Sequence, residues 1–145
     1  MSTTAQNVFD LTMAVIDELN DNGKADTSDT REYKNRTLQI LNILQGELYL
    51  YSDTYKASEN GKRSIAIPII SFNEPIADLD DYICRTVLPY GLAAHLLMDE
   101  NPSLADTCLQ RYEELRAKLM SGLNTGSEDI KDLYGGFAHC EFGYW

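Results

Sequence analysis

Histidine and cysteine side chains are the first candidates for metal binding or nucleophilic chemistry in this chain. There are two histidines, His95 and His139, and three cysteines, Cys84, Cys108 and Cys140. Only His139 and Cys140 are neighbours, and no C-x2-C or H-x3-H spacing of the kind that holds zinc occurs. An odd number of widely spaced cysteines is also a poor disulfide framework. Cys84 and Cys108 fall on apolar helix faces, so we expect them to be small core residues and expect no metal and no cofactor.

Carboxylates come next, because Asp78, Asp80, Asp81 and the pair Asp99-Glu100 are grouped closely enough to suggest acid–base chemistry. Such chemistry needs burial or a neighbouring charge to shift a pKa. These acids stand instead at expected helix starts and ends, where capping and the helix dipole explain them. The chain also has no G-x-S-x-G, G-x-x-x-x-G-K or G-x-G-x-x-G motif. We therefore expect no enzymatic activity.

The composition favours one acidic globular domain. The chain has 145 residues, of which 43% are apolar, and a formal net charge of −11 from 23 acidic and 12 basic residues. Scattered basic residues argue against a surface that grips nucleic acid, which needs clustered Lys and Arg. The longest apolar patch, Leu92 to Met98, is too short for a membrane span, and no basic leader with an apolar run opens the sequence. A soluble, intracellular protein without membrane contact is expected.

Helices must position most of these side chains, because apolar residues recur at helical spacing. The first helix is predicted from Asn7, acting as cap, to about Asn20. The second opens with a capping box of Asp29 and Glu32 and continues for about 22 residues. Its inward positions are Tyr33, Thr37, Ile40, Leu41, Leu44, Leu48 and Tyr51.

A third helix is predicted to open at residues 78–81 and to kink at Pro89, because proline removes a backbone donor and clashes with the preceding turn. The small residues Gly91, Ala93 and Ala94 would let a neighbouring helix approach closely. The fourth helix restarts at Asn101-Pro102, with asparagine as the cap, and ends near Gly122. Its predicted inward positions are Leu104, Ala105, Cys108, Leu109, Tyr112, Leu115 and Leu119.

Between the second and third helices the sequence changes character. Residues 64–70 are rich in β-branched side chains, and Asn60-Gly61 is a strong turn dipeptide. We predict a small, irregular β-hairpin of Tyr51–Ala57 against Ser64–Ile67, or a loop with one short strand. Pro68 cannot donate to a ladder, so any strand is an edge strand or ends there.

The C-terminal segment is unusually aromatic. We divide the chain into a helical domain, residues 1–126, and an extended tail, residues 127–145. The tail packs on its own domain or docks into a groove of another chain, since exposed aromatic clusters favour burial; simple disorder is the third alternative. Tyr90, His95 and Met98 lie off the main apolar stripe and are candidates for self-association. The partner-binding candidates in the tail are Tyr134, Phe137, Phe142, Tyr144 and Trp145.

The stretch from Val87 to Leu119 contains the motifs Leu92-Ala93-Ala94, Leu96-Leu97, Asp99-Glu100-Asn101 and Tyr112-Glu113-Glu114-Leu115. With these motifs it resembles head–tail connector (adaptor) proteins of tailed phages and prophages. In that family an early helix pair is followed by a short β excursion, a small-residue helix, an acidic break and a further helix. The similar layout covers Asn7 to Leu119.

The resemblance implies a mainly α, non-catalytic virion protein that assembles in the host cytoplasm. Such adaptors form a ring, often of twelve copies, beneath the portal protein and extend the DNA channel. The implied partners are the portal, a neck or stopper or tail protein, and other copies of the chain. DNA passes through without sequence-specific binding, and the C-terminal segment docks on the portal. Two other readings stay open: a neck stopper or tail-completion protein, and a small acidic regulatory protein that binds a basic partner.

Overall fold

Four α-helices form the fold in a computed structural model that describes residues 2–16 and 28–122. A short 3-10 turn, η1 (Tyr49–Tyr51), follows the second helix, and a π-helical segment, η2 (Ile83–Val87), precedes the third. Within the described ranges there is no β-strand, only an isolated bridge between Thr4 and Pro75. The mainly α prediction is confirmed. The helices are α1 (Ala5–Val15), α2 (Ser28–Leu48), α3 (Leu88–Leu96) and α4 (Pro102–Gly122).

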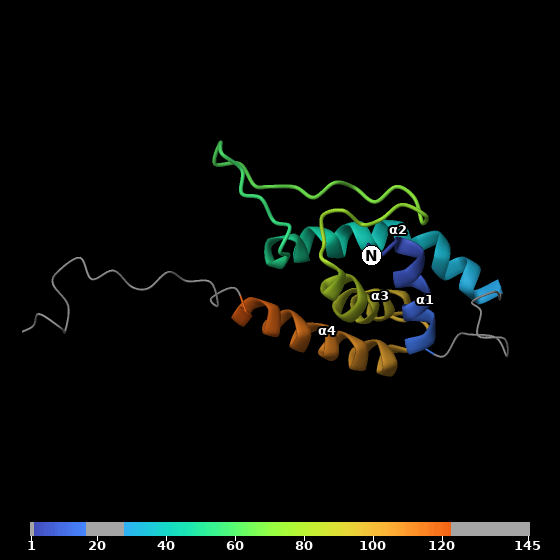
Figure 1. The fold of residues 1–145 in the computed structure, drawn as a ribbon. Coiled ribbons are helices and arrows are strands. Elements are labelled where there is room, and N and C mark those ends of the chain that lie inside the picture. The colour runs from blue at the N-terminus through green and yellow to red at the C-terminus, as the bar shows by residue number, and fades with distance from the viewer. Residues whose placement is uncertain (1, 17–27, 123–145) are drawn as a thin grey trace, which may run out of the picture.

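Helix α3 is the centre of the molecule and packs against the other three helices (Figure 1). It lies between α2 and α4, with α1 alongside. Its position explains its composition, because a helix that is covered on several sides carries apolar residues around most of its circumference. The fully or nearly fully buried residues of α3 are Leu88, Pro89, Gly91, Leu92, Ala93, Ala94 and Leu96.

The close approach predicted for the small residues of α3 is confirmed at Gly91. A Cβ atom built there would lie 3.0 Å from two ring carbons of Tyr112 on α4 and 3.1 Å from a methyl carbon of Leu44 on α2. Real Cβ contacts are seldom that short, so glycine lets both flanking helices come this near. Gly46, on the outer side of α2, has nothing within 4 Å of such an atom.

Helix α1 starts earlier than predicted. Its cap is Thr4, whose hydroxyl accepts a hydrogen bond from the Asn7 amide at 3.2 Å, while the Asn7 side chain accepts one from the Thr4 amide at 3.0 Å. Asn7 is therefore the third helical residue of a reciprocal capping box and not the cap itself. The predicted end near Asn20 lies outside the described residues.

The irregularity expected at Pro89 lies one turn earlier, in η2. The Leu88 amide donates to the carbonyl of Ile83, five residues back, which is the π-helical pattern. Proline has no amide to donate to the carbonyl four residues before it, so the wider turn fits at this place. Pro89 then stands in the first turn of α3, where its missing donor costs nothing.

Helix α4 begins as predicted, because the Asn101 side chain accepts a hydrogen bond from the Leu104 amide at 3.2 Å. Ala105, Cys108, Tyr112 and Leu115 are buried, and the exposed face is polar. The prediction for Leu109 was wrong, since its side chain is 41% exposed. Leu104 and Leu119 are partly buried at the two ends.

The predicted hairpin between Tyr51–Ala57 and Ser64–Ile67 is not present. Its backbone donors are taken up elsewhere: the Ile67 amide donates to the Asp78 carboxylate and the Ile69 amide to the Asn42 side chain. Side chains thus replace the ladder that the opposite strand would have supplied. The turn at Asn60-Gly61 does form, with Gly61 at φ 68°, the left-handed region that glycine occupies readily.

Candidate interaction surface

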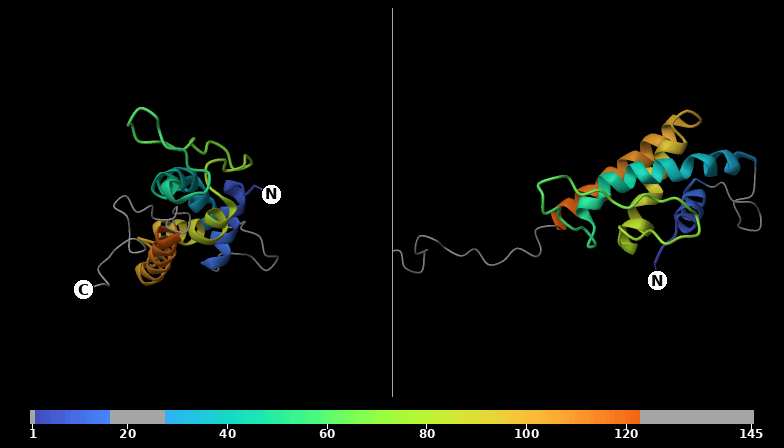
Figure 2. Two further views of the ribbon diagram at one scale, coloured as in Figure 1. Left: turned by 60° about the vertical axis from the view of Figure 1, so that its left-hand side comes forward. Right: turned by 90° about the horizontal axis from the view of Figure 1, so that it is seen from above.

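Residues 52–79, the connecting segment, run from η1 back along α2 to the start of the third helical region (Figures 1 and 2). The first residues of this segment are held by hydrogen bonds to residues at its C-terminal end and just beyond it. The Ser52 hydroxyl accepts from the Asp80 amide at 3.0 Å, and the Asp80 carboxylate accepts from the Asp53 amide at 3.2 Å. The Thr54 hydroxyl donates to the carbonyl of Asp78. The two ends of the segment are thereby tied together.

The returning limb is held against α2 and α1. The Asn42 side chain donates to the Ile69 carbonyl at 3.0 Å and accepts from the Ile69 amide at 2.7 Å, which satisfies both backbone groups of one buried residue. Phe72 packs edge-on against Phe9 of α1, with ring centroids 6.3 Å apart. The ammonium of Lys34 lies 4.9 Å from the Phe72 ring, within cation–π range. The segment is therefore fixed at several points without being a strand.

Between these anchors lies the isoleucine arm, residues 64–70. Ile65, Ile67 and Ile70 are 86%, 65% and 75% exposed, while Ile69 alone points inward. Scattered exposed aliphatics are ordinary, but three such large ones within six residues of one extended segment indicate a contact surface. Because the segment is tied down on both sides, the three side chains are presented outward in a defined arrangement, which lowers the entropy cost of binding.

The arm also differs from the rest of the chain in charge. Lys56, Lys62 and Arg63 precede it against one carboxylate, Glu59, so residues 55–72 carry a net charge of +2 in a chain of net −11. All four side chains are exposed. A basic and aliphatic surface of this kind suits an acidic partner with apolar patches.

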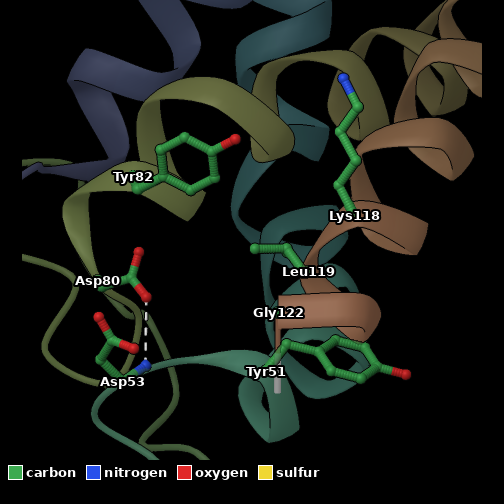
Figure 3. Close-up of a pocket in the computed structure, with 7 residues that line it drawn as sticks. All are labelled: Tyr51, Asp53, Asp80, Tyr82, Lys118, Leu119 and Gly122. Atoms are coloured by element: carbon green, nitrogen blue, oxygen red, sulfur yellow. Dashed lines mark hydrogen bonds between the residues drawn. The ribbon is translucent and has the colours of Figure 1, made fainter. Parts of the chain in front are cut away.

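A hollow of about 260 Å³ lies beside the base of the connecting segment (Figure 3). It is lined by Tyr51, Asp53, Asp80, Tyr82, Lys118, Leu119 and Gly122. Asp80 accepts from the backbone amides of Asp53 and Ile83, at 3.2 and 2.9 Å, so its carboxylate is used to hold the chain. Figure 3 shows the Lys118 ammonium directed away from the two aspartates. The hollow holds no nucleophile next to a base, and we assign it no chemistry.

Two thiols and one phenol have pKa values above their ordinary ones, and burial within the fold is the main cause. Burial is the main cause that raises the pKa of the Cys84 thiol to about 12, and burial likewise raises that of Cys108. A reactive thiol needs the opposite shift. Burial, and then the hydrogen bond to the Glu47 carboxylate at 2.8 Å, raise the pKa of Tyr112. Both cysteines are free and buried, as the sequence predicted.

Asp81 joins the N-terminal segment to the third helical region. Its carboxylate accepts hydrogen bonds from the Thr3 hydroxyl and the Thr3 amide, both at 2.9 Å. The bond from the hydroxyl is the largest cause that lowers the pKa of Asp81; the amide and the Arg85 guanidinium act in the same direction, and partial burial opposes them. Arg85 in turn donates to the Thr3 hydroxyl at 3.2 Å. The carboxylate is a structural acceptor.

No group of three or more metal-ligating side chains occurs among residues 2–16 and 28–122. In the same part of the chain, no helix has both the length and the apolar character needed to span a membrane. Every buried side-chain nitrogen or oxygen there has a hydrogen-bond partner. No buried side-chain nitrogen or oxygen in the described residues therefore lacks a partner that a ligand would have to supply.

The residues that the sequence suggested for self-association and partner binding lie in three places. Tyr90 is half-buried, with the Arg111 guanidinium 6.0 Å above its ring. His95 is partly buried on α3, and Met98, just past the end of α3, is 58% exposed. The aromatic residues Tyr134, Phe137, Phe142, Tyr144 and Trp145 lie outside the described residues.

The sequence did not predict the isoleucine arm as an exposed surface. Ile65 and Ile67 were assigned to a hairpin strand, in which residues two apart share one face of the sheet. The signal that could have revealed the arm is the run Ile-Ala-Ile-Pro-Ile-Ile itself, because it holds more aliphatic side chains than one short edge strand can bury.

Searches of protein-family models, curated proteins and solved structures found no match to this chain.

Proposed function

We propose that this protein is a structural head–tail connector of a tailed phage or prophage, which forms a ring under the portal and extends the DNA channel. The proposal assigns it to the neck of the virion and gives it no catalytic role. Its partners are the portal protein, the next neck or tail protein and further copies of itself.

The isoleucine arm is the observation that carries the proposal. A helical body with an anchored, outward-facing aliphatic segment suits a protein whose work is to bind other proteins. Among the described residues, Asp80, Asp81 and Tyr112 make structural hydrogen bonds. The thiols of Cys84 and Cys108 are buried. An assembly role accounts for the exposed isoleucines, which a self-contained monomer would leave without a purpose.

The arrangement of elements supports the same family. Val87 to Leu119, the stretch that carries the resemblance, comprises the end of η2, α3, the acidic turn Asp99-Glu100-Asn101 and most of α4. Two helices precede it, and the connecting segment occupies the place of the family's β excursion. The net charge of −11 suits a channel wall past which DNA slides, because like charges repel.

The tail, residues 127–145, is proposed to dock on the portal through Tyr134, Phe137, Phe142, Tyr144 and Trp145. Extended segments with aromatic anchors bind grooves of partner proteins in this way. The test is removal of Gly135 to Trp145, followed by a binding assay against the portal protein encoded in the same genome.

The truncated chain is expected to keep the helical circular dichroism spectrum and the melting temperature of the full chain and to lose portal binding. A truncated chain that still binds the portal as tightly would contradict tail docking. If it unfolds, the tail belongs to the core. A genome without portal and capsid genes around this one would exclude the connector function altogether.

The alternative function, a small acidic regulatory protein, predicts a different outcome in the same binding assay. A small acidic inhibitor would form a stoichiometric complex with a basic cellular protein and would not bind the portal. A stopper or tail-completion protein would bind the neck assembly only after another connector is in place.

A further inference from the structure

The isoleucine arm requires a binding surface that is both apolar and acidic. Three exposed isoleucines supply the apolar part, and Lys62 and Arg63 lie immediately before them in the sequence. Water-exposed aliphatic side chains gain roughly 25 cal/mol for each Å² that a partner covers, so a matching surface would be favoured. The chain itself is a source of acidic surface, given its net charge of −11.

A groove of suitable chemistry lies where the N-terminal half of α2 meets the α3–α4 junction. Its volume is about 410 Å³, and its lining residues are Glu32, Asn35, Arg36, Leu96, Asp99 and Glu100. Arg36 is engaged within the fold, since it donates to the Leu96 carbonyl at 3.3 Å and stands over the Tyr33 ring. The carboxylates of Glu32 and Asp99 are exposed, and Met98, also exposed, adjoins them in sequence.

The connecting segment starts at the end of α2 away from this groove, and the arm then returns along the helix, where Ile69 is held at Asn42. The connecting segment leaves from the C-terminal end of α2 through η1, whereas the groove is lined by Glu32, Asn35 and Arg36 near the other end. At 1.5 Å per residue, Asn35 in the groove and Asn42, which holds Ile69, are about 10 Å apart along the helix. Figures 1 and 2 show the turn of the connecting segment and the α3–α4 junction toward opposite ends of the molecule.

We propose that the isoleucine arm of one copy, with Lys62 and Arg63, docks on the groove between α2 and the α3–α4 junction of a second copy. Two different surfaces make a heterologous, head-to-tail contact, which builds a closed ring or an open filament and not a symmetric dimer. Ile65 and Ile67 cover the exposed side chain of Met98, while Lys62 and Arg63 face Glu32 and Asp99. The inference rests on the proposed ring, and it specifies which surfaces join neighbouring copies.

The contact can be mapped by photo-cross-linking in the full chain. Ile65 is replaced by p-benzoylphenylalanine, and equal amounts of ¹⁴N- and ¹⁵N-labelled protein are mixed at high concentration, both alone and bound to the portal. Mixed-isotope peptides then identify cross-links between copies. The matched control carries the same photoreactive residue at Ile43, an exposed aliphatic on α2 outside the arm.

The expected result is a ladder of cross-linked oligomers in which Ile65 joins residues 32–36 or 96–100 of a neighbouring copy, with little product from the Ile43 control. Cross-links within one copy, cross-links that map elsewhere, a product that stops at the dimer, or no cross-link in either sample would each overturn the proposal.

Charge reversal provides an independent check. Lys62→Glu with Arg63→Glu, and separately Glu32→Lys with Asp99→Lys, should each lower the cross-link yield roughly tenfold, because like charges then meet across the contact. Mixing the two variants should restore the contact in both directions, because each arm then meets a groove of opposite charge, and cross-linked oligomers of alternating variants should reappear. All four positions are exposed, so both variants should keep the fold. Yields that stay unchanged in both variants would argue against the assigned pairing.

The same samples separate this inference from the proposed function. Portal binding without the mapped cross-links leaves the connector function standing and removes the arm-to-groove contact. Mapped cross-links without portal binding establish self-assembly and remove the connector function.

Discussion

At the residue scale, the polar groups with shifted pKa values hold elements together. Tyr112 of α4 reaches Glu47 of α2 through its hydroxyl, and Arg116 lies over its ring. Asp81 ties the N-terminal segment to the third helical region through Thr3. Each of these contacts makes folding stability depend on pH in a direction that can be stated.

Replacing Tyr112 with phenylalanine should cost about 1 kcal/mol near neutral pH, because one hydrogen bond to Glu47 is lost while the ring stays packed. The pKa of Tyr112 is raised on folding, so its contribution is fully present below about pH 10, the unfolded value. It declines as the pH rises further. Urea unfolding of both proteins between pH 7 and 11 should show the stability difference shrinking above pH 10. A difference that grows there would contradict this account.

Replacing Asp81 with asparagine tests the opposite sign. The pKa of Asp81 is lowered on folding, chiefly by the Thr3 hydroxyl, so its contribution is present above about pH 4, the unfolded value, and is lost as the pH falls below it. The original chain should be the more stable at pH 7, and the two proteins should converge at pH 2–3. A constant gap in urea unfolding across this range would show that Asp81 titrates normally.

At the element scale, the packing of α3 depends on the absence of one methyl group. Gly91→Ala should destabilise the fold by about 1–2 kcal/mol, because the Tyr112 ring, pinned by Glu47, has little room to retreat. Gly46→Ala is the matched control on α2. With nothing within 4 Å, it should stabilise the helix by up to about 1 kcal/mol. Thermal unfolding of both variants gives the comparison, and equal shifts would contradict the tight approach at Gly91.

The returning limb of the connecting segment depends on Asn42. Asn42→Ala removes the partner of both the amide and the carbonyl of buried Ile69, which should cost about 1–3 kcal/mol locally. The Ile69 amide should then exchange with deuterium at least tenfold faster, while the amides of α3 keep their protection. Unchanged exchange at Ile69 would mean that other contacts hold the arm.

The sequence predicted the helices well where one face is buried. The face of α2 from Tyr33 to Leu48 and the capped start at Asn101 follow from local spacing and cap chemistry. Leu109 was misassigned because an apolar residue next to the buried face can lie on either side of its edge. Thr4 was missed as the cap of α1, although its reciprocal bonds with Asn7 follow the known pattern.

The connecting segment could not be predicted from local signals. Its apolar residues and the Asn60-Gly61 turn are typical of a hairpin. The segment is not a hairpin because its amides bond to distant side chains: Ile69 to Asn42, and Ile67 to Asp78. Such side-chain acceptors take up backbone amides that a β-ladder would otherwise use. They leave no periodic pattern in the sequence. The exposure of the three isoleucines follows from this geometry and was hidden for the same reason.

At the scale of the whole molecule, an acidic helical body carries a basic and aliphatic segment along α2 and a separate groove with acidic side chains beside the α3–α4 junction. This polarity suits directional assembly, in which each copy offers a different surface to each neighbour. The stretch on which the proposed connector family rests, residues 87–119, comprises the central helix, its acidic turn and most of α4, which form the scaffold. The partner contacts are proposed for the arm, the groove and the tail that the scaffold carries.

The most direct test of the connector function is the mass of the portal assembly, from the genome that encodes this chain, after mixing with the full-length protein. Mass photometry should show a single heavier species whose gain equals one 16.3 kDa chain for each portal subunit. The Gly135–Trp145 deletion should give no gain. A portal whose mass is unchanged at a large excess of the full chain would contradict the account.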